Sequence, residues 1–324
     1  MARSRSDKAP DAARAPVEPG ARMPTGTTTR CGFVALIGAP NAGKSTLLNQ
    51  LVGAKISIVS RKVQTTRTQV RGIAMAGETQ AIFVDTPGIF APKRRLDRAM
   101  VTSAWGGATD ADVIGVLIDV AKFEHEETIA LLERLDELRQ PKFLILNKID
   151  TVAKEQLLAI TVAVNARAQF ETTFMVAALS GYGVPDILTW LETRLPMGPW
   201  LYPEDQISDA PLRFLASEIT REKIYERLHD ELPYRSTVET EKWEQKADGS
   251  VRIEQTIYVE RESQRKIVLG EAGQTIKSIG QASRMDIAEA AETKVHLFLF
   301  VKVRENWSDD PERYREMGLV FPKE

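Results

Sequence analysis

The chain has 324 residues, which is enough for two domains of ordinary size. Its 43 Lys and Arg residues are balanced by 45 Asp and Glu residues, so the overall charge predicts no bulk attraction to nucleic acid or to an anionic membrane. The single cysteine, Cys31, excludes a disulfide within the chain and fits a reducing compartment, and the three histidines are too far apart for a metal-spaced cluster. No apolar run approaches the roughly 20 residues that span a bilayer, so we expect a soluble intracellular protein.

Residues 1–28 are predicted to form a disordered tail. They are rich in Arg, Ala, Pro, Ser and Thr, and they lack the apolar core of a secretory signal peptide. Three acidic residues, Asp7, Asp11 and Glu18, argue against an organelle transit peptide. Met23 is an alternative start.

Residues 29–196 have the pattern of an α/β domain. Its five apolar stretches are CGFVALIG, AIFVDTPG, DVIGVLIDV, KFLILNKID and TFMVAAL. Stretches that are apolar throughout are typical of strands buried on both faces, and segments with a helical period, such as residues 126–137, lie between them. We therefore expect a mostly parallel sheet with helices on both faces. The proline-rich residues 197–210 are predicted to be a linker.

Residues 211–304 have a different pattern, which indicates a smaller α+β domain. A helical period over residues 212–228 precedes two strand patterns, residues 235–246 and 251–260, around the turn sequence ADGS. A pair of helices and the strand KVHLFLFVKV complete the order, and the apolar run that ends at Leu269 looks strand-like. Residues 305–324 are assigned to a C-terminal tail.

A phosphate-binding pattern directly follows the first buried strand. The stretch GAPNAGKST matches G-x-x-x-x-G-K-[ST], in which glycines let backbone N–H groups turn towards phosphate oxygens at the start of a helix. Lys44 is expected to reach the β- and γ-phosphates, and Ser45 to offer its hydroxyl to magnesium. The predicted nucleotide-binding residues of this loop are Gly38, Ala39, Pro40, Asn41, Ala42, Gly43, Lys44, Ser45 and Thr46.

Two polar stretches at the ends of later strands add to this site. FVDTPG places Asp85 in the magnesium shell, through a water, and turns the Gly88 N–H towards the γ-phosphate. In NKID, an aspartate accepts both the N1–H and the N2 amino hydrogens of guanine, a donor pair that adenine lacks, while Lys148 lies along the purine face. The predicted contacts are Asp85, Thr86, Pro87, Gly88, Ile89, Asn147, Lys148 and Asp150.

Between these stretches, QTTRTQVRG offers Thr65 and Thr66 in a polar connection. A threonine that reaches magnesium only when the γ-phosphate is present allows a loop to report the nucleotide state. We assign this role to Thr66, so that Ser45, Thr66 and Asp85 form the predicted magnesium site.

These motifs resemble those of the translation-factor-like GTPases. The resemblance implies GTP and GDP as ligands and a contact from the Ala178 N–H to guanine O6, although Ala177 stands where the family usually has serine. It also implies a potassium ion bound with the help of Asn41. Ile89 replaces the glutamine that orients water in Ras-like proteins, so we expect slow intrinsic hydrolysis. The predicted catalytic residues are Lys44, Asn41 and Thr66.

The stretch GEAG in the second domain is predicted to bind RNA. Its surroundings have the element order of a type II KH domain, whose G-x-x-G backbone clamps about four single-stranded nucleotides beside an apolar groove. Glu271 and Ala272 depart from the usual G-K-G-G, and residues 211–304 hold 16 basic and 16 acidic residues. We therefore expect a shallow salt dependence of RNA binding. The predicted RNA-binding residues are Gly270, Glu271, Ala272, Gly273, Lys277, Arg284, Arg265 and Lys266.

A GTPase domain followed by a KH domain resembles the Era-type ribosome-assembly GTPases. The resemblance runs from residue 33 to about residue 307 and includes SRKVQTTRTQVRGI, VERESQRKIVLG, IKSIG and VKVRENW. It implies binding to the 3′ end of small-subunit ribosomal RNA and a GTP-dependent role in small-subunit maturation. It further implies a cytoplasmic location with peripheral association to the inner membrane. We expect a monomer.

Three alternatives stay open at this point. A P-loop kinase of small molecules would need neither NKID nor a KH domain. A nucleotide-regulated RNA-binding scaffold with little catalysis is favoured by Ile89. A regulator of other single-stranded RNA would share every motif and differ only in its target.

Overall fold

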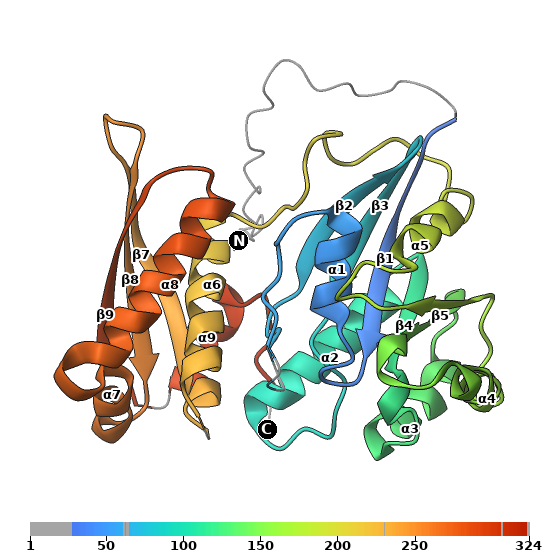
Figure 1. The fold of residues 1–324 in the computed structure, drawn as a ribbon, viewed down its shortest axis with the longest axis horizontal. Coiled ribbons are helices and arrows are strands. Elements are labelled where there is room, and N and C mark those ends of the chain that lie inside the picture. Colours follow the sequence, from blue (N-terminus) through green and yellow to red (C-terminus); the bar gives the residue numbers. More distant parts are fainter. Residues whose placement is uncertain (1–27, 61, 63–64, 230, 306, 323–324) are drawn as a thin grey trace, which may run out of the picture.

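The computed structural model describes residues 28–322, except for residues 61, 63–64, 230 and 306. The predicted tail, residues 1–28, lies outside the described residues apart from Thr28. The described chain forms two domains side by side (Figure 1), and residues 197–210 connect them.

The first domain is built on a six-stranded sheet in the order β2-β3-β1-β4-β5-β6. Its strands are β1 (Arg30–Gly38), β2 (Val70–Ala76), β3 (Thr79–Asp85), β4 (Val113–Asp119), β5 (Lys142–Asn147) and β6 (Thr173–Val176). All neighbouring strands are parallel except β2 and β3, which confirms the predicted, mostly parallel sheet. The edge strand β2 was not predicted, because its sequence VRGIAMA mixes an arginine and a glycine with small residues and has no continuous apolar run.

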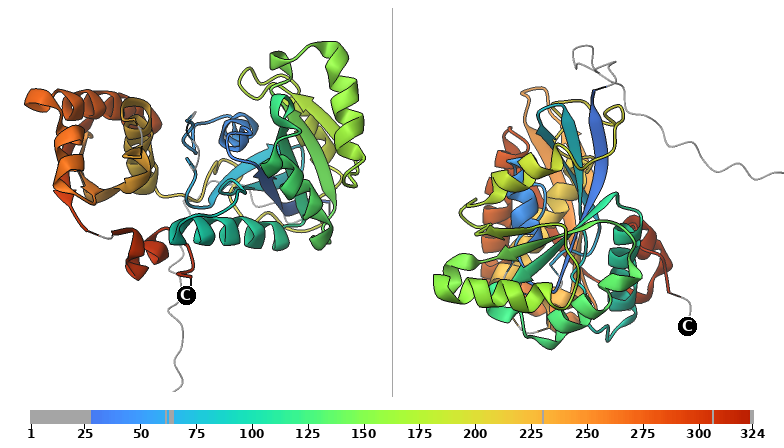
Figure 2. Two further views of the ribbon diagram at one scale, coloured as in Figure 1. Left: turned by 90° about the horizontal axis from the view of Figure 1, so that it is seen from below. Right: turned by 90° about the vertical axis from the view of Figure 1, so that its right-hand side faces the viewer.

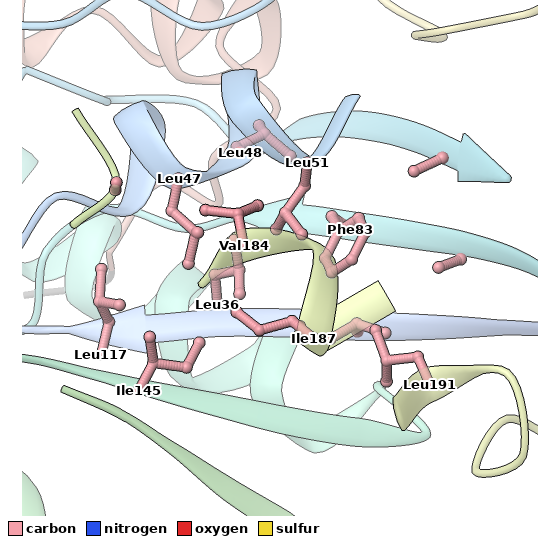
Figure 3. Packing of buried hydrophobic residues seen from close by; sticks show 14 of the residues in the cluster. Leu36, Leu47, Leu48, Leu51, Phe83, Leu117, Ile145, Val184, Ile187 and Leu191 are labelled. Carbon is pink, nitrogen blue, oxygen red and sulfur yellow. The ribbon is translucent and has the colours of Figure 1, made fainter. Parts of the chain in front are cut away.

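Helices cover both faces of this sheet, as predicted. α1 (Lys44–Val52) and α5 (Val184–Leu191) pack on one face, where their leucines and isoleucines meet Leu36 and Phe83 (Figure 3). α2 (Arg95–Thr109), α3 (Glu126–Glu133) and α4 (Lys154–Asn165) pack on the other. Each fully buried Leu or Ile contributes about 1.5–3 kcal/mol to the stability of this scaffold. Short 3-10 turns follow β4, α3 and β5 in the chain: η1 (Val120–Lys122), η2 (Leu135–Glu137) and η3 (Ile149–Thr151).

The second domain has a three-stranded sheet with helices on one face. The order of its elements is α6 (Leu212–Arg227), β7 (Ser236–Gln245), β8 (Val251–Val259), α7 (Glu262–Leu269), α8 (Gln274–Ala290) and β9 (Val295–Val303), with the 3-10 turns η4 (Pro233–Arg235) before β7 and η5 (Glu271–Gly273) before α8. β8 lies between β7, to which it is antiparallel, and β9, to which it is parallel. This is the predicted helix, hairpin, helix pair and strand.

The strand-like interpretation of the run that ends at Leu269 was wrong, because this run is the last turn of α7. The Gln264 carboxamide accepts the backbone N–H groups of Glu260 and Arg261 and begins the helix. The Gly270 N–H donates to Lys266 O at 2.9 Å, which is the i to i−4 bond of an α-helix. A run of three apolar residues is too short to distinguish a strand from one helical turn.

The C-terminal segment, residues 305–322, joins the two domains. It contains η6 (Trp307–Asp309) and α9 (Pro311–Glu316), and it forms a buried cluster in which Trp307, Tyr314 and Leu319 pack on Leu96 and Met100 of α2. Figure 2 shows this red segment beside α2. None of the described helices is both long enough and apolar enough to cross a membrane.

Candidate nucleotide site and candidate RNA groove

The phosphate-binding loop runs from the end of β1 to the start of α1, and its shape depends on two glycines. A Cβ on Gly38 would lie 2.5 Å from the Leu117 carbonyl oxygen, and a Cβ on Gly43, whose φ is +104°, would lie 2.3 Å from Asn147 Nδ2. Lys44 is buried, and its Nζ donates to the carbonyl oxygens of Gly38 (3.0 Å) and Ala39 (3.1 Å). Burial lowers the pKa of Lys44 to about 8, and nearby Asp85 opposes this shift.

Three hydroxyl groups meet one carboxylate at the predicted magnesium site. Asp85 Oδ2 accepts from Ser45 Oγ at 2.7 Å, from Ser57 Oγ at 3.0 Å and from Thr66 Oγ1 at 3.3 Å, and the hydroxyls of Ser45 and Thr66 lie 2.9 Å apart. Asp85 Oδ1 is buried and has no partner among the described residues. Burial raises the pKa of Asp85, while the neighbouring Lys44 opposes this. Hydroxyl and carboxylate oxygens suit a hard cation such as magnesium, so these residues fit the predicted ion.

Sequence reasoning missed Ser57. Asn49 of α1 holds it in place: the Asn49 Oδ1 accepts the N–H groups of Ile56 and Ser57 at 3.0 Å each, and Nδ2 donates to Ser57 O at 2.8 Å. The stretch KISIVS contains no pattern that marks this serine. The side chain of Thr65 bonds to Lys62 O instead of Asp85, so Thr66 is the threonine that reaches the carboxylate.

The residues after β3 close the phosphate end of the site. Thr86 Oγ1 donates to Leu36 O at 2.8 Å, and Pro87 and Gly88 follow; a Cβ on Gly88 would lie 3.0 Å from the Pro40 Cα. The Ile89 N–H donates to Gly38 O at 3.0 Å, and its side chain is buried in the cluster between the sheet and α2. The Ile89 side chain therefore packs in the core and cannot orient a water molecule.

Asn147 and Lys148 connect the phosphate loop to the base end of the site. Asn147 Nδ2 donates to Ala42 O at 2.7 Å, and its Oδ1 accepts the Ala178 N–H at 3.0 Å. Lys148 Nζ donates to Asn41 O and to Asp119 Oδ2, both at 2.7 Å. Sequence reasoning missed Asp119, which ends β4.

The remaining predicted contacts to the nucleotide differ in their exposure and in whether their backbone N–H groups are already bonded. Asp150 is exposed, whereas Ala177 is buried. The Ala178 N–H, expected to contact guanine O6, is already bonded to Asn147, so the base must share or replace that bond. Asn41 has a φ of +61°, which asparagine tolerates well, and it lines one pocket with Thr46, Thr66 and Gly88.

The segment that carries Thr66 packs against α6 of the second domain. Lys55 Nζ lies 2.7 Å from the Glu222 carboxylate, whose other oxygen accepts the Val59 N–H at 2.8 Å. Arg221 Nη2 donates to Thr65 O. A residue next to Thr66 is therefore bonded directly to the second domain.

The GEAG stretch connects α7 to α8 as the short turn η5. Gly270 has a φ of +75°, and a Cβ there would lie 2.2 Å from Thr275 Oγ1. Ala272 and Gly273 also have positive φ, 49° and 76°. Glu271 and Ala272 are exposed, and the first N–H groups of α8 follow them, which is a geometry that favours phosphate.

A groove lies beside this turn, between α8 and β9. Its lining residues are Ile276, Lys277, Gly280, Gln281, Arg284, Leu297 and Leu299. Two of the predicted RNA-binding residues, Lys277 and Arg284, therefore line this groove. Arg265 is paired with Glu262 at 2.8 Å and donates to Val301 O, and Lys266 is exposed in the last turn of α7.

Comparison with known proteins decides the family. The family model described as a 50S ribosome-binding GTPase matches residues 33–148, and the KH domain model matches residues 231–308. GTPase Era of Mesorhizobium japonicum is 68% identical over 294 residues, which are 91% of this chain and 95% of the relative. The chain belongs to the GTPase Era family. GTPase Era of Brucella suis is 65% identical, with the same shares of the two chains covered.

Two solved Era structures share the whole architecture. A crystal structure of Era in complex with MgGDPNP and nucleotides 1506–1542 of 16S ribosomal RNA has a TM-score of 0.85 at 34% identity, over 90% of this chain and 99% of that one. A single-residue variant of Aquifex aeolicus Era bound to GDP.AlF4- has a TM-score of 0.84 at the same identity and coverage. The predicted fold, a GTPase domain followed by a KH domain, is confirmed.

Proposed function

We propose that this chain is a GTP-binding and GTP-hydrolysing switch that binds the 3′ end of 16S ribosomal RNA and acts in assembly of the small ribosomal subunit. One observation carries the proposal. Thr66, 3.3 Å from Asp85 and 2.9 Å from Ser45, is on a segment that is bonded to the KH helix α6. The residue positioned to report the γ-phosphate is therefore directly connected to the candidate RNA-binding domain.

In the proposed reaction, the chain positions GTP and stabilises charge and forms no covalent bond to the nucleotide. Lys44 would move from the loop carbonyl oxygens to the β- and γ-phosphates. Ser45, Thr66 and Asp85 would hold magnesium, which supplies positive charge at the phosphate oxygens when it is bound. Asn147, Lys148 and Asp150 would bind guanine, with Ala177 and Ala178 beside the base.

We also propose that potassium takes part. Ile89 is buried in the core, so the side chain after DTPG supplies no water-orienting group. Asn41 lines the pocket that also holds Lys44 and Gly88, where an additional cation would lie near the phosphates. An ion at this place would add to the positive charge that Lys44 supplies in the same pocket.

The RNA assignment rests on the groove and on the Era relative. That relative was crystallised with nucleotides 1506–1542 of 16S RNA, which is the RNA of the small subunit. The description of the GTPase family model names the large ribosomal subunit, but this model matches only the first domain. The RNA-bound relative matches 90% of this chain. We therefore favour the small subunit. A monomer in the cytoplasm that associates peripherally with the inner membrane remains a prediction from the family resemblance.

A second candidate function is a nucleotide-regulated RNA-binding scaffold with little catalysis, which the burial of Ile89 favours. Multiple-turnover release of phosphate from GTP distinguishes the two. The switch predicts several turnovers per chain that Lys44→Ala abolishes, whereas the scaffold predicts less than one turnover and an effect of Lys44→Ala on binding alone.

The RNA target is tested by crosslinking the chain to RNA in cells, followed by sequencing, with variants held in the GTP and GDP states. We expect enrichment of the 3′ end of 16S RNA that depends on the nucleotide state. Enrichment of other single-stranded RNA without this end would reject the proposed target.

A further inference from the structure

The outward face of β9 carries two exposed aromatic rings that the proposed groove does not use. Along β9, Leu297 and Leu299 point towards the helices and line the groove, so the alternating residues Phe298 and Phe300 point to the opposite face. Their exposed fractions are 42% and 47%, which is unusual for phenylalanine. β9 is the edge strand of its sheet, on the side of the KH domain away from the GTPase domain (Figure 1).

We propose that Phe298 and Phe300 form a second RNA contact, on which bases of a single strand stack after the strand leaves the groove. This inference rests on the proposed function, because it extends the path of the same RNA. The class of ligand is a single-stranded RNA segment that continues from the groove-bound nucleotides. We call the two phenylalanines and their flanking residues Arg252 and Lys302 the aromatic face.

The spacing of the rings suits stacked bases. Residues two apart on a strand lie roughly 6.5 Å from each other, so the two rings offer separate platforms on one line. The Arg252 guanidinium lies 4.5 Å from the Phe298 ring centroid, and Lys302 follows Phe300 on the same face. Aromatic side chains on the open face of a sheet are a known arrangement for binding unpaired bases.

The aromatic face and the groove lie on the two faces of the same edge strand. Leu297 and Leu299 line the groove, and the two phenylalanines alternate with them on the same strand. Because β9 is an edge strand, a nucleotide chain that leaves the groove can pass around its free edge and reach the rings on the other face. A clamp for about four nucleotides leaves the remainder of a longer RNA without a contact, and this face is the adjacent aromatic surface.

The surroundings of the rings favour RNA over a protein partner. The β8 residues beside the rings on this face are Arg252, Glu254, Thr256 and Tyr258, so the two rings do not belong to a continuous apolar patch of the kind that docks a protein. Stacking of bases requires only single rings. Arg252 is paired with Glu254 at 2.7 Å, and Lys302 with Glu241 at 3.1 Å. The contact therefore depends on stacking and adds little to the salt dependence.

The test measures affinity by fluorescence anisotropy for nested fragments of the 16S 3′ end: the shortest fragment that binds, and the same fragment extended at its 5′ or its 3′ end. We expect one extension to tighten binding. Phe298→Ala with Phe300→Ala should remove this gain, by about tenfold per ring, without changing affinity for the short fragment or the slope against salt. The matched control is Leu158→Ala, which removes a 71% exposed apolar side chain from α4.

A second pair of variants keeps the test decisive if the alanine variant is unstable. Phe298→Leu with Phe300→Leu retains apolar surface without a π face and should also lose the gain, whereas Phe300→Trp should preserve or increase it. The proposed second RNA contact would be overturned if the leucine variant kept the gain in affinity from the extension. It would also be overturned if a variant with unchanged thermal unfolding lost binding to the short fragment. If the short fragment binds and extension adds nothing, only this inference fails. If no fragment binds the unaltered chain, the proposed RNA function fails as well.

Discussion

The carboxylate of Glu222, on α6 of the KH domain, accepts the backbone N–H of Val59 at 2.8 Å and pairs with Lys55 of the GTPase domain at 2.7 Å. The Glu222 side chain is buried, whereas that of Lys55 is 39% exposed, so salt screens this ion pair only in part. The two contacts of Glu222 attach the segment that carries Thr66 to the helix on which the KH sheet packs. The two domains are therefore bonded at the place where the nucleotide state is expected to change the structure.

Replacing Glu222 by alanine should weaken the dependence of RNA affinity on the nucleotide. Coupling between sites typically amounts to about 1–3 kcal/mol. We expect Glu222→Ala to remove part of it, because Val59 loses its acceptor while the bond from Arg221 to Thr65 O remains. The measurement compares RNA affinity with a GTP analogue and with GDP. Glu226→Ala, which removes a more exposed acid from the same helix, is the control. An unchanged affinity ratio in Glu222→Ala would exclude this connection.

Ser57 should contribute to magnesium binding although it belongs to none of the predicted motifs. Its hydroxyl holds Asp85 Oδ2 at 3.0 Å, and loss of one such hydrogen bond costs about 1 kcal/mol. We expect Ser57→Ala to raise about fivefold the magnesium concentration that is needed to retain GDP. The readout is the rate of release of a fluorescent GDP analogue as magnesium is varied. Ser283→Ala, which removes a buried hydroxyl without a hydrogen-bond partner among the described residues of the KH domain, should have no such effect.

Nucleotide affinity should fall as the pH rises above about 8. Burial lowers the pKa of Lys44 from 10.5 to about 8, and bound phosphate raises it again, so binding takes up a proton above this pH. In the nucleotide-free chain, the charged lysine opposes folding below about pH 8, and this cost disappears between pH 8 and 10.5 because the unfolded chain then binds more protons. GDP titrations between about pH 7 and 10 test the binding trend. The Lys44→Arg variant, whose side chain stays charged, should bind GDP weakly and should not show this fall in affinity.

Glu271→Lys should tighten RNA binding and steepen its salt dependence. Glu271 is exposed in the GEAG turn at the start of α8, where a cation would approach a clamped phosphate. One new phosphate contact changes the slope of log affinity against log salt by about one. The control is Glu289→Lys, the same charge change at an exposed position near the other end of α8. Equal effects of both variants would mean that GEAG does not face the phosphates.

GTP hydrolysis should be faster in potassium buffer than in sodium buffer. The reason is the proposed additional cation beside Asn41, and Asn41→Ala should reduce the difference. Because Asn41 has a φ of +61°, Asn41→Gly serves as a second variant that keeps the backbone shape. Equal rates in the two buffers for the unaltered chain would rule out a role for potassium.

The nucleotide loop, the DTPG and NKID motifs and the order of KH elements were predictable because each depends on neighbouring residues. Gly43, whose φ is +104°, shapes the backbone of its own loop, and an unbroken apolar run indicates a buried parallel strand. The strand prediction for the run before Gly270 was wrong, because three apolar residues fit a helical turn as well as a strand.

Contacts between distant segments were decided by tertiary packing. Ser57 reaches Asp85 because Asn49 of α1 holds its backbone, Asp119 meets Lys148 because β4 and β5 are adjacent, and Val59 meets Glu222 because the domains pack together. Trp307 and Tyr314 of the predicted C-terminal tail are buried against α2 in the same way. None of these pairs has a local signature, because a hydrogen bond or an apolar contact between segments depends on where the whole chain places them.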